Sequence, residues 1–282
     1  MVDVPPAHRN TTNPLPDHLL NFPDKARQMR IPAFEPASPN GPEFITALTE
    51  LKPDLFMAAG YALILKPEVL GVPRILAVNF HASLLPEYRG KHPVFWALRE
   101  TEKWTGLTVH AMDPGIDTGD ILYQVKVRTQ RDDSVASLYE RIIASSVQLV
   151  EQLVADAACG CIPRFPQPAE GGSYYSSTCE TDFLLDWQWP AERIRRFITI
   201  TPGKCFTVTG EQRVYFLNAE SERLAEAAPP GTLLRIGRIR AVVAANLGAV
   251  SSSRVQVEDC QAESFAAYCR RQGLVPGDRL SM

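Results

Sequence analysis

The spacing of apolar and polar positions predicts alternating strands and helices over residues 43–160. Short apolar runs of this kind are typical of buried strands, whereas apolar residues every three to four positions mark one face of a helix. Strands are expected at Leu55–Ala59, Ile75–Phe80, Leu107–Met112 and Leu122–Val127. Helices are expected at Asp24–Met29, Glu43–Leu51 and Pro93–Arg99. A long helix is expected to begin with Asp133 or Ser134 as its cap and to end before Gly160. This alternation favours an α/β fold with a parallel, Rossmann-like sheet over residues 1–165.

Beyond residue 165 the pattern changes. A stretch rich in Pro, Gly and Ser predicts a linker over residues 166–180. One helix is then expected at Pro190–Ile200, with Pro at its first position. Short strands follow at Cys205–Thr209, Arg213–Leu217, Thr232–Ile236 and Arg240–Ala244. They predict a small β-barrel, OB-like domain over residues 181–282.

Composition excludes some functions. Apolar residues make up 45% and charged residues 22% of the 282 positions, as in soluble globular proteins. A net charge of −3 provides no global attraction to nucleic acid, so such contacts need a local patch. Two arginine groups are candidates, although solvated surface positions explain them equally well: Arg193, Arg195 and Arg196, and Arg235, Arg238 and Arg240. The near-apolar run Leu55–Leu65 is shorter than the ~18 residues of a membrane span, so no membrane association is expected.

The six cysteines predict no disulfide framework and no metal site. Their spacings match no zinc pattern, and Cys159 and Cys161 are too close together in the sequence for a framework. We therefore expect free thiols in a reducing compartment. The N-terminus lacks the pattern of a secretory signal, which favours a cytoplasmic protein.

Three polar residues near one expected sheet edge are candidates for catalysis. Asn79 and His81 lie at the carboxyl end of the strand Ile75–Phe80, two positions apart and so on one face. Asp117 lies in the turn-rich loop after the next strand, which we expect to reach the same edge. The amide N–H of Asn79 can stabilise a tetrahedral oxyanion, and neutral His81 can accept or relay a proton. Asp117 can orient His81 and raise its pKa. The trio suits acyl transfer to an amine.

Other functions for the neighbouring residues are weaker. Ser83 lacks the Gly-x-Ser-x-Gly context of a nucleophile, so we expect a structural serine. Asp113 is expected to be a turn former. His110 and Asp113 could join His81 and Asp117 in a metal site, but no pair has the His-x-x-x-His spacing of a metal site, and no metal is expected. His92 and His110 either line the acceptor side or are structural.

Three ordered motifs resemble the folate-dependent formyltransferase family. They are Asn-x-His-x-Ser-Leu-Leu-Pro from Asn79, Arg-Gly-x-x-Pro from Arg89, and Asp-x-Gly-x-Asp-Thr-Gly from Asp113. The resemblance implies that Asn79, His81 and Asp117 are catalytic and that 10-formyltetrahydrofolate donates the formyl group. It also implies that the folate contacts are Tyr61, Leu63, Ile64, Leu65, Ser83, Leu84, Leu85, Pro86, Asp113, Gly115 and Ile116.

The C-terminal region is similar to that of the methionyl-tRNA formyltransferase branch. The similar motifs begin at Asp186-Trp187, Gly231-Thr232 and Gly273. This resemblance implies initiator methionyl-tRNA as the acceptor and no protein partner. Three departures bear on the acceptor: Lys91-His92 after Arg89-Gly90, His110 after Thr108-Val109, and the segment Pro202-Gly203-Lys204-Cys205. The alternatives are an N-formyltransferase for an amino-sugar nucleotide or other small amine, a deformylase, and an inactive folate- or RNA-binding relative.

Members of the family begin with a strand, a glycine-containing turn and a helix ahead of the region that matches residues 2–35. We therefore expect a start codon placed too late or a truncation, which would leave a sheet edge unpaired. On this expectation the 282-residue chain aggregates and binds folate poorly until that unit is restored.

Overall fold

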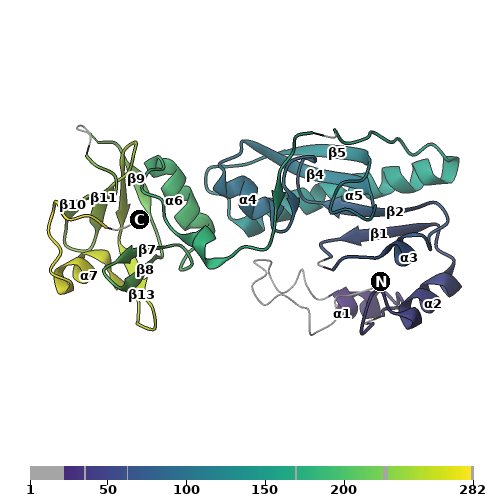
Figure 1. Ribbon diagram of the computed structural model, residues 1–282, viewed down its shortest axis with the longest axis horizontal. Coiled ribbons are helices and arrows are strands. Elements are labelled where there is room, and N and C mark those ends of the chain that lie inside the picture. Colours follow the sequence, from purple (N-terminus) through teal and green to yellow (C-terminus); the bar gives the residue numbers. More distant parts are fainter. Residues whose placement is uncertain (1–21, 35, 62, 169, 225–227, 281–282) are drawn as a thin grey trace. The chain divides into compact units, whose positions relative to one another are not determined.

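A computed structural model describes residues 22–34, 36–61, 63–168, 170–224 and 228–280 (Figure 1). The chain forms two compact units. Of the described residues, the first unit contains those up to Ala97 and those in 103–129 and 135–177, and the second contains those in 98–102, 130–134 and 178–280. Residues 166–168 and 170–177, which are part of the predicted linker, belong to the first unit.

The first unit contains a four-stranded sheet. Its strands are β1 (Leu55–Ala59), β2 (Leu76–His81), β4 (Trp104–Ala111) and β5 (Ile121–Arg128), in the order β1-β2-β4-β5 (Figure 1). β1 and β2 are parallel, whereas β4 is antiparallel to both of its neighbours. The α/β class is confirmed, but the sheet is mixed because β4 and β5 form a hairpin.

Four of the helices in this unit were predicted from the sequence, and the short α3 was not. The helices are α1 (Phe22–Gln28), α2 (Pro42–Leu51), the short α3 (Pro67–Leu70), α4 (Pro93–Arg99) and α5 (Val135–Cys159). Phe44 and Leu48 of α2 form a core cluster with Leu65 and Val69. α4 has the predicted bounds.

The long helix α5 packs on the sheet. Among the described residues it is the one helix with the length and apolar composition of a membrane span, which is weak evidence by itself. Its buried stripe consists of Val135, Leu138, Ile142 and Leu153, and the helix contacts β4 and β5. The other faces of α5 are exposed or half-buried, so the contacts with the sheet use one narrow stripe of the helix.

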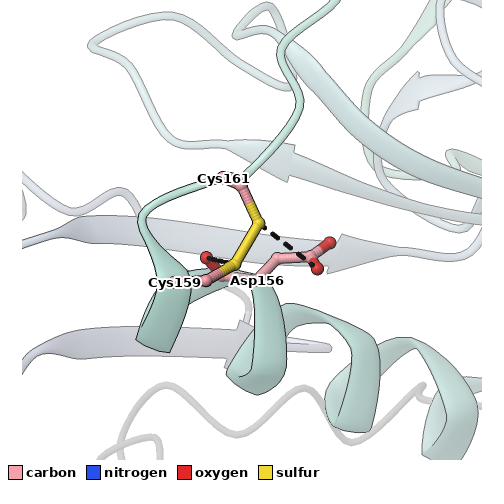
Figure 2. A group of neighbouring side chains, drawn as sticks. All are labelled: Asp156, Cys159 and Cys161. Atoms are coloured by element: carbon pink, nitrogen blue, oxygen red, sulfur yellow. Dashed lines mark hydrogen bonds between the residues drawn. A yellow bond between two sulfur atoms is a disulfide. The ribbon is translucent and has the colours of Figure 1, made fainter.

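A disulfide joins Cys159 to Cys161 just after the last turn of α5 (Figure 2). The prediction of free thiols is therefore wrong for this pair. Gly160 adopts a positive φ of 69°, and the reversal brings the two Cα atoms to 5.5 Å, a usual separation for bridged cysteines. Sequence proximity alone therefore does not exclude a bridge. The other four cysteines are free.

The second unit is built from antiparallel strands, as predicted. One sheet has the order β10-β11-β12-β9 and the other β14-β13-β8-β7. The bounds are β7 (Phe206–Thr209), β8 (Gln212–Phe216), β9 (Glu220–Glu222), β10 (Leu233–Ile236), β11 (Ala241–Ala244), β12 (Ala249–Ser252), β13 (Arg254–Val257) and β14 (Glu263–Ser264). The 3-10 helix η3 (Glu180–Phe183) and the helices α6 (Ala191–Ile200) and α7 (Phe265–Arg271) complete the unit. Pro190 caps α6 rather than occupying its first position.

Arg195 of α6 holds this unit together instead of facing solvent. It is 7% exposed, and its guanidinium donates to Glu192 at 3.0 and 3.1 Å, to Asp132 at 3.3 Å and to the Arg131 carbonyl at 3.1 Å. A buried guanidinium is stable only with such partners. Arg195 is therefore not available as the surface contact that its sequence position suggested.

We expect Arg195→Ala to lower the free energy of unfolding by about 1–3 kcal/mol, because hydrogen bonds to charged groups contribute amounts of this order. Arg238 is exposed and provides the matched control, whose replacement by Ala should change stability by less than about 0.5 kcal/mol. Urea denaturation measures both variants. Equal stabilities of Arg195→Ala and Arg238→Ala would contradict the structural role of Arg195.

Candidate active site

A cavity of about 880 Å³ lies in the first unit. It is lined by the end of β1 and the loop that follows, by β2, by the start of α5, and by two loops that contain Gly90 and Asp117. Seven of the residues expected to contact folate line it: Tyr61, Leu63, Ile64, Leu65, Asp113, Gly115 and Ile116. The cavity also contains all three candidate catalytic residues.

The remaining four expected folate contacts, Ser83, Leu84, Leu85 and Pro86, do not line the cavity. Ser83 is fully buried and donates through its hydroxyl to the Glu87 carbonyl at 2.7 Å. The Leu85 N–H donates to Thr108 Oγ1 at 3.1 Å. These hydrogen bonds give the segment a structural part in the loop after β2, and its contact with folate stays a prediction.

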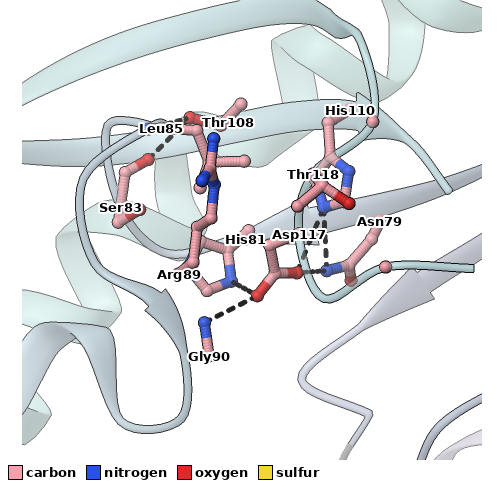
Figure 3. Close-up of polar contacts among 12 residues, drawn as sticks. Asn79, His81, Ser83, Leu85, Arg89, Gly90, Thr108, His110, Asp117 and Thr118 are labelled. Atoms are coloured by element: carbon pink, nitrogen blue, oxygen red, sulfur yellow. Dashed lines mark hydrogen bonds and ion pairs between the residues drawn. The ribbon is translucent and has the colours of Figure 1, made fainter. Parts of the chain in front are cut away.

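Asn79 and Asp117 are in direct contact (Figure 3). The amide Nδ2 of Asn79 donates to Asp117 Oδ1 at 3.2 Å and lies 3.2 Å from His110 Nε2. Asp117 Oδ2 accepts the backbone N–H of Gly90 at 2.8 Å and lies 3.5 Å from His81 Nδ1. The predicted trio is thus brought together, with Gly90 and His110 as further members.

Asp117 reaches this place by a route that the sequence did not indicate. Because β4 is antiparallel to β2, the carboxyl end of β4 pairs with the start of β2, Ala111 opposite Val78. The loop after β4 turns back along the sheet, and Asp117 adopts a positive φ of 54°. Asp113 shapes this loop by accepting hydrogen bonds from the Gly115 N–H and the Thr118 hydroxyl.

His81 is buried and has a defined tautomer. Its Nε2 lies 2.7 Å from the Tyr88 carbonyl, which only accepts, so Nε2 carries the proton in the neutral ring. Nδ1 then presents its lone pair toward Asp117. Burial lowers the pKa of His81 and outweighs the carboxylate of Asp117, which raises it. Asp117 thus raises the pKa as expected, but burial has the larger effect, so the pKa lies below its ordinary value and the neutral form is favoured.

Asp117 is ionised although its side chain is only 11% exposed. Burial by itself raises the pKa of this carboxyl. The contact with His110, the neighbouring His81 ring and the N–H of Gly90 together lower it, to about 2. A carboxylate held in this way stays negative throughout the range in which a histidine titrates.

His110 belongs to the same network. It lies opposite Asn79 on β4, its Nδ1 donates to the Ala111 carbonyl at 2.8 Å, and its Nε2 lies 3.3 Å from Asp117 Oδ1. Nε2 of His110 therefore lies within reach of both the Asn79 amide and the Asp117 carboxylate. The sequence left His110 open between an acceptor-side and a structural role, and only strand pairing could place it beside Asn79.

Gln167 holds the loop that contains Asp117 by hydrogen bonds to its backbone. Sequence reasoning missed this residue. Its Nε2 donates to the carbonyls of Asp117 and Gly119, both at 2.8 Å. Its Oε1 accepts Arg89 at 2.7 and 3.1 Å. Gln167 therefore ties the two loops that supply Asp117 and Gly90. Its position in a Pro- and Gly-rich stretch concealed this role.

Gly90 is required at its position. β3 (Arg89–Gly90) pairs in parallel with β6 (Tyr174–Tyr175), and Gly90 has a φ of 92°. A Cβ atom there would lie 2.1 Å from the Tyr175 carbonyl oxygen. Only glycine allows this close pairing, which directs the Gly90 N–H toward Asp117.

Comparisons with known proteins identify the family of the chain. Residues 8–154 match the family model for formyl transferase, and residues 179–273 match the model for the formyl transferase C-terminal domain. The chain is 30% identical to the methionyl-tRNA formyltransferase of Geobacter metallireducens, over 90% of this chain and 82% of that protein. It is also 30% identical to the enzyme of the same name from Pelotomaculum thermopropionicum, over 91% and 84%.

Solved structures show the same fold at low identity. The N-formyltransferase from Helicobacter canadensis, with folinic acid and dTDP-3-aminofucose, matches with a TM-score of 0.62 at 17% identity, over 83% of this chain and 82% of that one. HypX from Aquifex aeolicus with tetrahydrofolic acid matches with a TM-score of 0.58 at 17% identity, over 92% of this chain and 47% of that one. These two structures therefore show a fold that this chain shares. The chain belongs to the formyl transferase family and is a formyltransferase.

We expect Gln167→Ala to lower kcat by about 10–100-fold, since the loss of two hydrogen bonds of ~1 kcal/mol each loosens the Asp117 loop. Gln167→Glu keeps an acceptor for Arg89 but has no N–H for the carbonyls of Asp117 and Gly119. We expect its kcat to fall by a similar factor. Gln148→Ala, on an exposed part of α5, is the control. Full activity of Gln167→Glu would show that the bonds to Asp117 and Gly119 do not matter.

The histidine environment gives a pH prediction. In the folded protein the pKa of His81 should lie below its ordinary value of 6.5, because burial disfavours the imidazolium. Below pH 6.5 the unfolded chain then binds a proton that the folded chain does not, so stability falls as the pH drops. Asp117→Asn should lower the pKa of His81 further. An NMR titration, assigned with His81→Gln, measures this, and a pKa above 6.5 would contradict it.

Proposed function

We propose that this enzyme transfers the formyl group of 10-formyltetrahydrofolate to a primary amine, and that initiator methionyl-tRNA is the acceptor. The observation that carries the proposal is the contact of an amide, a neutral imidazole and an ionised carboxylate inside one cavity. Each of these groups meets one demand of transfer to an amine.

Asn79, His81 and Asp117 have different roles, which follow from the charge and protonation of each side chain. Asn79 is the donor to the oxyanion that forms when the amine attacks the formyl carbon, and a substrate oxygen would replace His110 Nε2 or Asp117 Oδ1 as the acceptor of its amide. His81 offers the lone pair on Nδ1 for the proton that the amine loses. Asp117 holds Asn79 in place and stabilises the imidazolium of His81 once it forms.

The cavity suits a folate. Its volume of about 880 Å³ lies within the range of ligand pockets, and the loop after β1 contributes Tyr61, Leu63 and Leu65 to its wall. Met112 and Ile116 add apolar surface beside Asp117. These side chains would cover the rings of the donor next to the catalytic trio.

Methionyl-tRNA as the acceptor is supported by relatives of that name that match most of the chain, the second unit included. Two of the candidate surface arginines, Arg235 and Arg240, are paired with Glu222 and Glu220, both at 3.1 Å. Arg238 is exposed, so we assign it the role of a phosphate contact. We also propose that the enzyme works in the cytoplasm.

A small amine with an anionic group, such as an amino-sugar nucleotide, is the second candidate. The observation that favours it is the pair Lys91 and His92 on the cavity wall, where the methionyl-tRNA branch has small residues. A lysine ammonium there would attract a phosphate group of the acceptor.

The proposal is tested with purified protein and 10-formyltetrahydrofolate, with release of tetrahydrofolate as the readout. Initiator methionyl-tRNA, an amino-sugar nucleotide and no acceptor are compared. We expect turnover with methionyl-tRNA, a loss of ~10²–10³ in Asn79→Ala, and double variants of Asn79, His81 and Asp117 little worse than single ones. Turnover with the amino-sugar nucleotide but not with methionyl-tRNA would favour the small amine as the acceptor. Near-normal turnover in His81→Ala would overturn the assigned roles.

A further inference from the structure

Cys159, Cys161 and Asp156 gather at the C-terminal end of α5, away from the catalytic cavity (Figure 2). The two sulfurs and a carboxylate oxygen all lie within 4.8 Å of one another. Cys161 Sγ is 3.8 Å from Asp156 Oδ1, and Cys159 Sγ is 3.4 Å from the Asp156 carbonyl oxygen. Both cysteines are exposed, so reagents in solution can reach them.

The end of the helix brings these groups together. The Gly160 N–H donates to the Ala157 carbonyl at 3.2 Å, and the Cys161 N–H donates to the Asp156 carbonyl at 2.9 Å. These bonds close the last turn of α5 and return Cys161 to the side of Asp156. They belong to the backbone, so the reversal does not depend on the bond between the sulfurs.

The Asp156 carboxylate is oriented by two further side chains. Tyr123 of β5 donates its hydroxyl to Oδ2 at 2.7 Å, and Gln152 Nε2 lies 2.9 Å from both carboxylate oxygens. Carboxylates that bind metals are characteristically held by hydrogen bonds of this kind. Cys179 provides a contrast, because it lies 3.3 Å from Asp182 but has no second sulfur beside it.

We propose that Cys159, Cys161 and Asp156, once the disulfide is reduced, form a site for a soft divalent cation of the Zn²⁺ type. A dithiol reductant breaks the S–S bond, each cysteine sulfur gains a proton, and the reductant becomes a disulfide. Zn²⁺ then displaces these two protons, forming two Zn–S bonds and one Zn–O bond, and water completes a tetrahedron. Thiolate ligands favour such cations over Mg²⁺ or Ca²⁺.

The experiment uses the full chain, with and without dithiol treatment and removal of the reductant, and measures bound Zn²⁺ by competition with a chromophoric chelator. Cd²⁺ reports thiolate ligation through its ultraviolet charge-transfer band. We expect one Zn²⁺ per reduced chain and none per oxidised chain. Tyr123→Phe should weaken Zn²⁺ binding by ~10–100-fold, as the loss of a supporting hydrogen bond does.

Matched variants separate this site from the other thiols. Cys159→Ser, Cys161→Ser and Asp156→Asn should each lose the tight Zn²⁺, whereas Cys179→Ser and Glu151→Gln, another acid on α5, should keep it. Circular dichroism confirms that each variant is folded. Zn²⁺ binding that survives in folded Cys159→Ser, or its absence from the reduced chain, would overturn the proposal.

Discussion

The active site depends on one buried negative charge. An ionised carboxylate that is mostly withdrawn from water loses several kcal/mol of solvation unless hydrogen bonds and nearby positive charge replace it. Asp117 is 11% exposed, and its partners come from three other segments of the chain: β2, the loop before α4 and β4. The drop in its pKa from 3.8 to about 2 corresponds to about 2 kcal/mol of preference for the charged form in the folded state. Folding of these segments and ionisation of Asp117 therefore support each other.

Because Asp117 stays ionised, His81 is the member of the pair whose protonation can change near neutral pH. His81 is deprived of water and faces Asp117 with its unprotonated nitrogen, so it is neutral at rest and its imidazolium is stabilised once it forms. The arrangement gives the fixed negative charge to Asp117 and the change of protonation to His81. Asp117 remains negative, and in the proposed reaction His81 is the group that changes charge. Gln167 contributes by fixing the loop, since a small shift of Asp117 would change both effects.

Much of the fold could be predicted from the sequence because periodicity records which side chains are buried. The bounds of α4 agree with the prediction, and β1 and α2 agree closely. The pattern does not record direction or partners. It could not show that β4 is antiparallel to β2. Asp117 was expected beside Asn79 and His81 because its loop follows a strand taken as parallel, whereas it comes there through a loop that turns back along the sheet. The short strand β9 lacks alternating apolar residues, and sequence reasoning missed it.

Local composition did not indicate the contacts of several side chains that hold the backbone in place. The stretch around Gln167 has the proline and glycine content of a linker, yet its amide completes the Asp117 loop. Arg195 has the sequence context of a surface charge, yet it is buried among acceptors. The Cys159–Cys161 pair matches no familiar spacing, because its geometry comes from the reversal after α5 and not from the interval between the cysteines.

The same segment separates the cysteine pair from the active site. After Cys161 the chain pairs with the start of β5, where Ile121 and Phe165 exchange two backbone hydrogen bonds of 2.9 Å. Gln167 follows this bridge, so its position is set by β5 and by Arg89 rather than by the turn at Gly160. We therefore expect a change at the sulfurs to affect the end of α5 and the hydrogen bond from Tyr123 to Asp156, and to leave the geometry around Asp117 unchanged.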